Sequence, residues 1–462
     1  MRRKTTRQIA PKTLPLAQLI KTASAQGQTP AAPQRTAGRL RQRSGVWHLE
    51  SAGHSIRLIA DGADAAARLT HGALVEVLGT LDAAHDADGK SPAFTVESLG
   101  IVHLPLTQEP ALSAQRQRSL AEAVQLRAHA NRRIRAFFDA RDFVEVETPN
   151  WVEAAGTDVH LSPVNASFQD PHRPAEEAIR GDLHTSPEFS MKRLLAGGLE
   201  RIWQMSKVWR NGEITPLHNP EFTLLEWYRA WEDLDAIIQD VEDLSRALIG
   251  EVARIGEREI SLEAPFLRMT MQEVIEAACG FDILEATDFD ALLAVCAERE
   301  LLSEHSLNRA RQTRRWDELF FELQIGYIDP FLDAQGPVFV TEWPTPLAVL
   351  ARTKPEDPRV AQRFELYIGG VELANGFQEL TDPKEQRARF EADLATRQAA
   401  GLPLPAMPER FLESLEWGLP PSSGVAVGVD RYLMLKSGAQ NIKEVAPFAM
   451  GRDLETGKAQ WS

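Results

Sequence analysis

The sequence contains few cysteines and no long apolar segment. Only Cys279 and Cys296 occur among its 462 residues, and they do not form a CxxC pair. This scarcity excludes a disulfide framework and a cysteine-based zinc site, and it predicts two reduced thiols within a core. No apolar run is long enough to cross a membrane, and none follows the basic N-terminus as in a secretory signal. We therefore expect a soluble, cytoplasmic protein.

Acidic residues are missing from the first 49 positions, which carry ten Lys or Arg. The whole chain nevertheless has a net charge of −15, so the rest of it is strongly acidic. An acidic body argues against broad, non-specific binding of nucleic acid. The basic segment could contact RNA or an acidic protein, but such segments are more often solvated tails. We interpret residues 1–34 as a flexible basic arm.

Two common nucleotide-binding signatures are also absent. The sequence has neither a GxxxxGK(S/T) loop nor a GxGxxG loop. Any use of ATP must therefore depend on residues other than those of a P-loop or a dinucleotide-binding turn.

The length of the chain and a change in its pattern indicate two domains. Residues 35–107 contain short apolar runs separated by Gly and Asp, which predict a small β-barrel. This segment resembles a shortened oligonucleotide-binding (OB) fold. Its only candidate platforms for stacking bases are Trp47 and Phe94, so packing or protein contact is at least as plausible as RNA binding. A Pro-containing linker is expected at 105–110.

Residues 111–462 mix helices and strands without a repeating βαβ rhythm. Apolar spacing predicts a helix at about 119–140 and then a short strand at 144–148. An α+β domain built on a mainly antiparallel sheet is therefore favoured over a doubly wound fold.

Residues 202–228 predict two strands joined by a turn-rich loop. Arg210 ends the first strand, where its guanidinium could clamp a carboxylate or a phosphate. In the second strand the period of two places Phe222, Glu226 and Tyr228 on one face. A ring, a carboxylate and a phenol on one face could form the floor of a small-ligand site.

Two further patterns are suggestive but unspecific. Glu365 and Glu372 flank Gly369-Gly370, a pair that predicts a hairpin turn and so brings the two carboxylates together. Such a pair suits Mg²⁺, which needs oxygen ligands, although it also fits an exposed hairpin with solvated side chains. Residues 423–435 combine a Gly-spaced strand with an apolar segment opened by Arg431, as at a tight strand–helix junction of any fold.

Together these segments resemble the class II lysyl-tRNA synthetase family. Residues 210–228 resemble its motif 2, residues 423–435 its motif 3, and residues 147–149 its motif 1, an interface element that implies a homodimer. With the lysine-pocket segments, these motifs span about residues 118–450 in the expected order. The resemblance implies an antiparallel sheet flanked by helices, and activation of an amino acid by ATP through an aminoacyl-adenylate.

The resemblance also implies roles for individual residues, with Arg210 and Arg431 as the catalytic cations. ATP would be bound by Arg210, Glu213, His218, Asn219, Phe222 and Arg431. Mg²⁺ would be bound by Glu365 and Glu372. The amino acid would be bound by Glu188, Glu226, Tyr228, Asn375, Glu379 and Ala426. The chain departs from the family at Gly212, where Glu is usual, and Glu213 would then take over the adenine contact.

Finer features resemble the branch of the family that attaches (R)-β-lysine to elongation factor P. Ala426 stands where lysyl-tRNA synthetases usually carry Gly, and a methyl group in a tight pocket changes discrimination by roughly 1–3 kcal/mol. Elongation factor P is then the expected protein partner. That branch usually lacks an N-terminal domain, so charging of tRNA(Lys) with lysine stays an alternative. A third alternative is an inactive, synthetase-like binding protein, although the predicted ATP and metal residues are all present.

Overall fold

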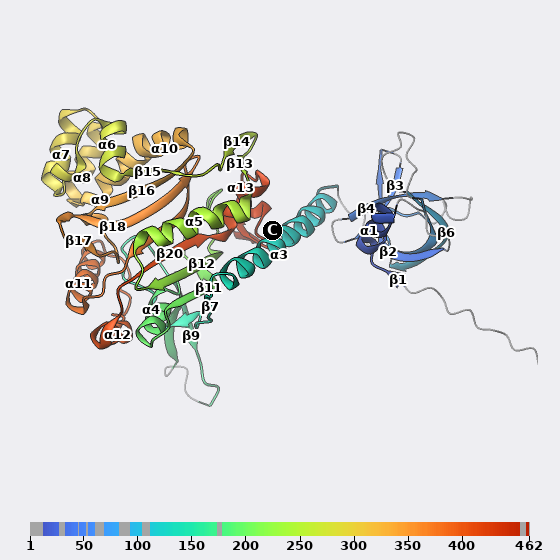
Figure 1. The fold of residues 1–462 in the computed structure, drawn as a ribbon, viewed down its shortest axis with the longest axis horizontal. Coiled ribbons are helices and arrows are strands. Elements are labelled where there is room, and N and C mark those ends of the chain that lie inside the picture. Colours follow the sequence, from blue (N-terminus) through green and yellow to red (C-terminus); the bar gives the residue numbers. More distant parts are fainter. Residues whose placement is uncertain are drawn as a thin grey trace, which may run out of the picture. The chain divides into compact units, whose positions relative to one another are not determined.

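The computed structural model describes residues 13–26, 33–44, 46–51, 54–60, 69–82, 93–103, 111–172, 178–452 and 459–461. The chain forms two compact units, residues 1–125 and 126–462 (Figure 1). The division falls within helix α3 (Ala111–Asp139), whereas the predicted linker at 105–110 lies outside the described residues. In the described ranges, no helix is both long enough and apolar enough to cross a membrane.

The first unit contains a closed five-stranded barrel. Strand β2 pairs with both β3 and β5, and β4 pairs with β6 in parallel, which closes the strand order β2-β3-β4-β6-β5. Alternate residues of β5 are buried, as expected for a strand with one face toward a barrel core. The predicted OB-like barrel is confirmed. Its strands are β2 (Gln34–Arg43), β3 (Val46–Ser51), β4 (His54–Ala60), β5 (Leu74–Asp82) and β6 (Ala93–His103).

Part of the predicted flexible arm is folded against this barrel. Strand β1 (Thr13–Leu14) pairs with β2, and helix α1 (Leu16–Gln26) follows it. Leu16 and Leu19 lie on one face of α1 and are buried in the barrel core, which explains why so short a helix is ordered. Residues 1–12 and 27–32 of the arm lie outside the described residues. One aromatic expectation was wrong: Phe94 is fully buried in that core and offers no stacking face, while Trp47 packs against it.

The second unit is built on a nine-stranded sheet that is mainly antiparallel. Only its β15–β16 and β7–β11 pairs are parallel among the described strands. The predicted α+β class II catalytic domain is confirmed. The strand order is β15-β16-β18-β19-β20-β12-β11-β7, with β17 beside β18. Their bounds are β7 (Val144–Glu145), β11 (Arg201–Trp209), β12 (Glu221–Ala230), β15 (Leu267–Thr270), β16 (Pro337–Pro344), β17 (Thr353–Lys354), β18 (Asp357–Ile368), β19 (Val371–Gln378) and β20 (Ser422–Gly428).

One face of this sheet forms the main core with α3, α5 (Leu234–Ile249) and α13 (Val429–Ser437) (Figure 1). Phe138 of α3 stacks on Trp203 with ring centroids 4.8 Å apart, and its edge meets Trp227. Asp233 caps α5 by accepting a hydrogen bond from the Ala236 amide. Helices α3, α5 and α13 therefore cover one face of the sheet. The opposite face is free of these three helices.

The remaining described elements surround the sheet. Smaller strands pair locally: β8 (Trp151–Val152), β9 (Val164–Phe168) and β10 (Ile179–Leu183) in one set, β13 (Val252–Ile255) with β14 (Arg258–Ser261), and β21 (Met450–Arg452) with β22 (Ala459–Trp461). Other helices are α4 (Glu188–Ala196), α11 (Pro383–Ala399) and α12 (Glu409–Gly418). Between β15 and β16 lie α6 (Met271–Cys279), α7 (Phe289–Glu298), α8 (Glu304–Thr313), α9 (Trp316–Leu323) and α10 (Asp329–Gln335).

Helices α6 to α10 enclose a second core that contains both cysteines. Cys279 and Cys296 are buried and form no disulfide. Burial raises the pKa of Cys279 to about 11 and that of Cys296 to about 12. Both thiols therefore stay protonated at neutral pH, and the prediction of reduced core cysteines is confirmed.

Candidate active site

The register of four adjacent strands aligns four of the predicted site residues. Glu226 of β12 is opposite Ala426 of β20, Ala426 is opposite Asn375 of β19, and Asn375 is opposite Glu365 of β18. Residues directly opposite each other in a sheet project from the same face. We call this line the site row.

The neighbouring line of residues is entirely apolar. Leu225 is opposite Val427, Val427 opposite Ala374, and Ala374 opposite Leu366, and all four belong to the main core. Successive residues of a strand point to opposite faces. The site row therefore projects from the face opposite the helices α3, α5 and α13.

Glu372 reaches the site face through a β-bulge. Tyr367 is opposite Glu372 and Leu366 is opposite Ala374, so Leu373 is an extra residue in β19. In a regular strand without this bulge, Glu372 and Asn375 would point to opposite faces, because they are three residues apart. The predicted hairpin turn is confirmed, because Gly369 and Gly370 form a two-residue connection with φ values of 57° and 74°.

Three carboxylates and one ammonium group meet beside the site row. Glu226 accepts hydrogen bonds from the Ser186 hydroxyl at 2.7 Å and the Tyr228 hydroxyl at 3.2 Å. The ammonium nitrogen of Lys192 lies 2.6 Å from Glu188 and 2.5 Å from Glu379. We call Glu188, Lys192, Glu226 and Glu379 the charged cluster; it is set by α4, β12 and the residue after β19.

Sequence reasoning identified Glu188, Glu226, Tyr228 and Glu379 but missed Lys192. Lys192 follows Glu188 by four residues on α4, a spacing that brings helical side chains together. That spacing was the available signal for this ion pair. The contact with Glu379, 187 positions further along the chain, had no local signal.

The buried carboxylates are easier to protonate than usual. Burial, followed by the nearby charge of Glu188, raises the pKa of Glu226 to about 8. Burial also raises the pKa of Glu379 to about 8, although the Lys192 charge opposes this effect. Burial raises the pKa of Tyr228 well above its usual value, so its hydroxyl stays neutral. A bound ammonium group would favour the ionised carboxylates.

The charged cluster and Tyr228 leave no space for a side chain at Gly424. A Cβ atom there would lie 2.3 Å from the Tyr228 ring and 2.6 Å from Glu379 Oε1. Ala426, two residues further along β20, carries a partly exposed methyl group between Glu226 and Asn375. This methyl group therefore borders the site that the carboxylates define.

The predicted ATP residues lie around the loop between β11 and β12. Arg210 follows β11 directly, and its guanidinium carbon lies 5.1 Å from the Phe222 ring centroid. Among the described residues, Arg210 Nε and Glu213 Oε2 are buried without a hydrogen-bond partner. A planar cation above a ring, with spare donors, suits an anionic ligand that carries a base.

His218 joins this loop to the start of α13. Its Nδ1 lies 2.7 Å from the Thr215 hydroxyl, and its Nε2 lies 2.7 Å from Arg431 Nη2. Burial and the Arg431 charge lower the pKa of His218, so its ring is neutral and Nε2 accepts from Arg431. Arg431 also donates to the Glu372 carbonyl at 2.7 Å. The two predicted catalytic arginines thus border one loop, with Glu213 and Glu372 close enough to affect His218 electrostatically.

Asn219 and Gly212 help to set the conformation of the loop between β11 and β12. Asn219 donates to the Glu221 carbonyl at 2.5 Å, and its Oδ1 is buried without a partner in the described chain. Gly212 has a φ of 86°, a conformation that side-chain-bearing residues rarely adopt. The backbone here therefore favours Gly at the position where the family usually has Glu.

The two predicted metal carboxylates differ in exposure: Glu365 is buried, whereas the Glu372 side chain is partly exposed. Glu365 is buried and accepts hydrogen bonds from Arg363 and Tyr367, two neighbours on β18 that sequence reasoning missed. Burial, opposed by Arg363 and reinforced by Glu372, raises the pKa of Glu365 to about 7. Among the described residues, no group of three or more His, Cys, Asp or Glu could hold a metal alone. Two carboxylates fit Mg²⁺, which commonly takes one or two from the protein and further ligands from phosphates.

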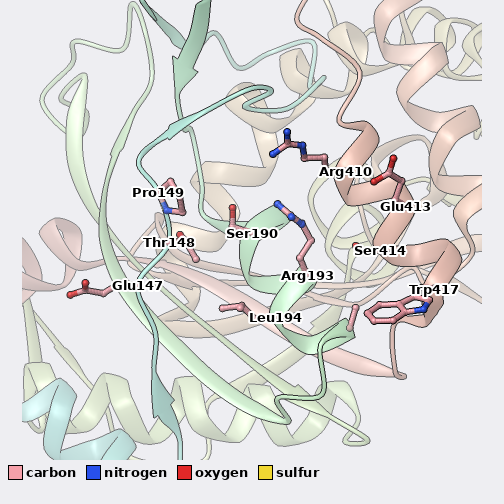
Figure 2. A pocket seen from close by; sticks show the side chains of 11 residues that line it. Glu147, Thr148, Pro149, Ser190, Arg193, Leu194, Arg410, Glu413, Ser414 and Trp417 are labelled. Carbon is pink, nitrogen blue, oxygen red and sulfur yellow. The ribbon is translucent and has the colours of Figure 1, made fainter. Parts of the chain in front are cut away.

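A separate hollow of about 540 Å³ lies beside α4 (Figure 2). Residues of the loop after β7, of α4 and of α12 line it, including Thr148, Arg193, Glu413 and Trp417. The Trp417 side chain is 85 % exposed although it is large and apolar.

The fold and this set of residues define a class II synthetase catalytic unit. Residues 106–452 match the family described as tRNA synthetases class II (D, K and N), and the chain belongs to that family.

The chain is also similar to curated proteins named elongation factor P–(R)-β-lysine ligase. The protein of Proteus mirabilis is 42 % identical over 319 residues, covering 69 % of this chain and 92 % of the relative. That of Klebsiella pneumoniae (strain 342) is 40 % identical over 327 residues, covering 71 % and 94 %. That of Haemophilus influenzae (strain Rd) is 39 % identical over 324 residues, covering 70 % and 94 %. The predicted resemblance is confirmed.

We expect Glu379→Ala to abolish most amino-acid activation. The change leaves the charge of a substrate ammonium uncompensated in a buried site, and such losses are about 2–5 kcal/mol. This corresponds to a fall of about 30-fold or more in kcat/KM for ATP–pyrophosphate exchange with lysine or (R)-β-lysine. Glu416→Ala, at an exposed position of α12, is the control and keeps wild-type exchange. Near-wild-type exchange in Glu379→Ala would refute the assignment of this pocket.

We expect the KM for the amino acid to fall as the pH rises from 6 to 8. In the substrate-free protein Glu226 and Glu379 each have a pKa of about 8. A substrate ammonium group favours the ionised carboxylates, so its binding below pH 8 releases protons. Each released proton changes KM by up to about tenfold per pH unit. Exchange kinetics at several pH values measure this slope. Glu379→Gln removes one titrating group and should flatten it, whereas an equally steep slope in that variant contradicts the assignment.

Proposed function

We propose that the protein activates (R)-β-lysine or lysine with ATP and transfers the aminoacyl group to a lysine side chain of elongation factor P. The relatives reported above carry this activity in their names and are covered over more than nine tenths of their length. The observation that carries the proposal is the position of Ala426, whose methyl group lies in the site row between Glu226 and Asn375.

In the first step a carboxylate oxygen of the amino acid attacks the α-phosphorus of ATP, and pyrophosphate leaves. In the second step the acceptor amine attacks the acyl carbonyl, loses a proton, and AMP leaves. Neither step needs a covalent protein nucleophile, so positioning and charge neutralisation supply most of the catalysis. Arg210 would contact the carboxylate and the α-phosphate, and Arg431 and His218 the outer phosphates.

The adenine ring would stack on Phe222, with Glu213 and Asn219 as polar neighbours. Glu365 and Glu372 would hold Mg²⁺, which neutralises phosphate charge when it is bound. Arg363 would then keep Glu365 ionised, because its guanidinium opposes the effect of burial on that carboxyl.

The charged cluster would select the substrate. Glu188, Glu226 and Glu379 offer negative charge to two ammonium groups, while Tyr228 and Asn375 offer neutral polar contacts. The methyl group of Ala426 would displace the α-carbon region of the substrate and so favour an amine shifted to the β-position. A single methyl group in such a pocket changes discrimination by roughly 1–3 kcal/mol.

We also propose that the protein is a homodimer, with the hollow beside α4 at its interface. The hollow includes Glu147, Thr148 and Pro149, which resemble motif 1, and it is bordered by the exposed Trp417. We further propose that the protein acts in the cytoplasm.

The proposed activity is tested by giving the protein ATP, Mg²⁺ and either lysine or (R)-β-lysine, with unmodified elongation factor P and tRNA(Lys) in parallel. We expect a mass increase of elongation factor P equal to one aminoacyl group, larger with (R)-β-lysine. Ala426→Gly should shift the preference toward lysine by about tenfold or more. Charging of tRNA alone would instead establish a lysyl-tRNA synthetase. Exchange with neither amino acid would establish an inactive relative.

The proposed dimer is tested with Trp417→Arg. A charge at the centre of a packed interface is costly to bury, so we expect the variant to elute and scatter light as a monomer while the wild type is a dimer. Ile325→Arg changes another strongly exposed apolar residue, which does not line the hollow, and should leave the dimer intact. A monomeric wild type, or a dimer that survives Trp417→Arg, contradicts the proposed interface.

A further inference from the structure

Lys192 is a fully buried cation in a site that is otherwise acidic. Its side chain has no solvent exposure, and its ammonium nitrogen lies 2.6 Å from Glu188 and 2.5 Å from Glu379. The ring of Phe411 on α12 lies 5.8 Å from the same nitrogen. Burying an ammonium group is unfavourable unless opposite charges surround it, and Glu188 and Glu379 supply these charges.

The charges around Lys192 can be counted from the groups that face it. Glu188 comes from α4, Glu226 from β12, and Glu379 follows β19; Tyr228 stays neutral because burial raises its pKa. With all three carboxylates ionised and Lys192 protonated, the cluster carries two net negative charges. A diamino acid brings two ammonium groups, while its carboxylate is directed to Arg210.

The hydrogen bonds of the cluster are unevenly distributed. Lys192 donates to Glu188 at 2.6 Å, whereas Glu379 lies within ion-pair distance without an aligned hydrogen bond. Oε1 of the buried Glu379 carboxylate accepts no hydrogen bond from another described residue, and Oε2 is contacted by Lys192. Glu379 can therefore still accept a hydrogen bond from a substrate ammonium group. Lys192 meanwhile reduces the net charge of the Glu188 and Glu379 carboxylates that it joins.

We propose that Lys192 is a positioning residue that cancels one of the three carboxylate charges, so that the site is matched to a substrate with two ammonium groups. This inference rests on the proposed function and adds a role for a residue that does not itself react.

The first test compares Lys192→Met with Lys192→Arg in the full-length protein. Methionine leaves three carboxylates facing two substrate ammonium groups, so one carboxylate must take up a proton to restore the balance. We expect kcat/KM for exchange with the preferred amino acid to fall at least tenfold at pH 8 and clearly less at pH 6. Lys192→Arg keeps the charge and should keep the wild-type pH profile, even if its activity is lower. A loss in Lys192→Met that is equal at both pH values would overturn the proposal.

The second test uses the substrate-free protein and needs no activity. A carboxyl with a folded-state pKa above its unfolded value binds more protons in the folded protein, so stability falls as the pH rises between the two values. For Glu226 and Glu379 this window runs from about 4.5 to about 8. Removal of the Lys192 charge should deepen this fall, giving Lys192→Met a larger Tm deficit at pH 8 than at pH 5.5.

Lys436→Met is the matched control for the second test. Lys436 is partly rather than fully buried, and its ammonium donates to the backbone carbonyl of Ile249 at 2.5 Å, with no carboxylate in this contact. Its replacement should lower Tm equally at both pH values. The same pH-independent deficit in Lys192→Met would show a packing role only and would overturn the proposal. If the wild type activates neither amino acid, the proposed function fails, while the Tm comparison still decides whether Lys192 balances the carboxylates.

Discussion

The register of strands β12, β20, β19 and β18 is the constraint on which both the core and the active site depend. It aligns Leu225, Val427, Ala374 and Leu366 toward the helices, and it aligns the site row on the opposite face. A slip of one strand by one residue would exchange its two faces. Glu226 would then enter the aromatic core without the hydroxyl donors that now satisfy it, which costs several kcal/mol. The packing that stabilises the sheet therefore also holds the chemistry in place.

Glu372 shows how this constraint is locally relaxed. It stands three residues from Asn375, so a regular strand would put the two side chains on opposite faces. The extra Leu373 absorbs this difference by packing into the core together with Ala374. The bulge thus gives Glu365, Glu372 and Asn375 a common face, and the hydrogen bond from Arg431 to the Glu372 carbonyl ties that face to α13.

Local patterns predicted more of this site than long-range ones. The alternation in residues 221–230 and the Gly369-Gly370 turn depend on neighbours in sequence, and both were predicted correctly. The alignment of Glu226 with Ala426 joins strands 200 positions apart and is set by packing, which the sequence does not display. The salt bridge between Lys192 and Glu379 was missed for the same reason. Helix α1 was missed because the apolar pattern of its described side chains is short, with Leu16 and Leu19 buried and Ile20 partly buried, and burial of Phe94 depended on closure of the barrel.

The barrel raises a different problem, because the family match begins only at residue 106. Its basic residues suggested a contact with RNA, yet the described ones are largely engaged within the barrel. Arg35 pairs with Glu76 at 3.0 Å, Arg43 pairs with Glu50, and Arg39 donates to the Gly72 carbonyl at 2.7 Å. Phosphate binding would require these guanidinium groups to leave their partners, which reduces the gain from each new ion pair. With Phe94 in the core as well, neither charge nor stacking on the described strands favours an RNA reader, and a role in packing or protein contact agrees better with these interactions.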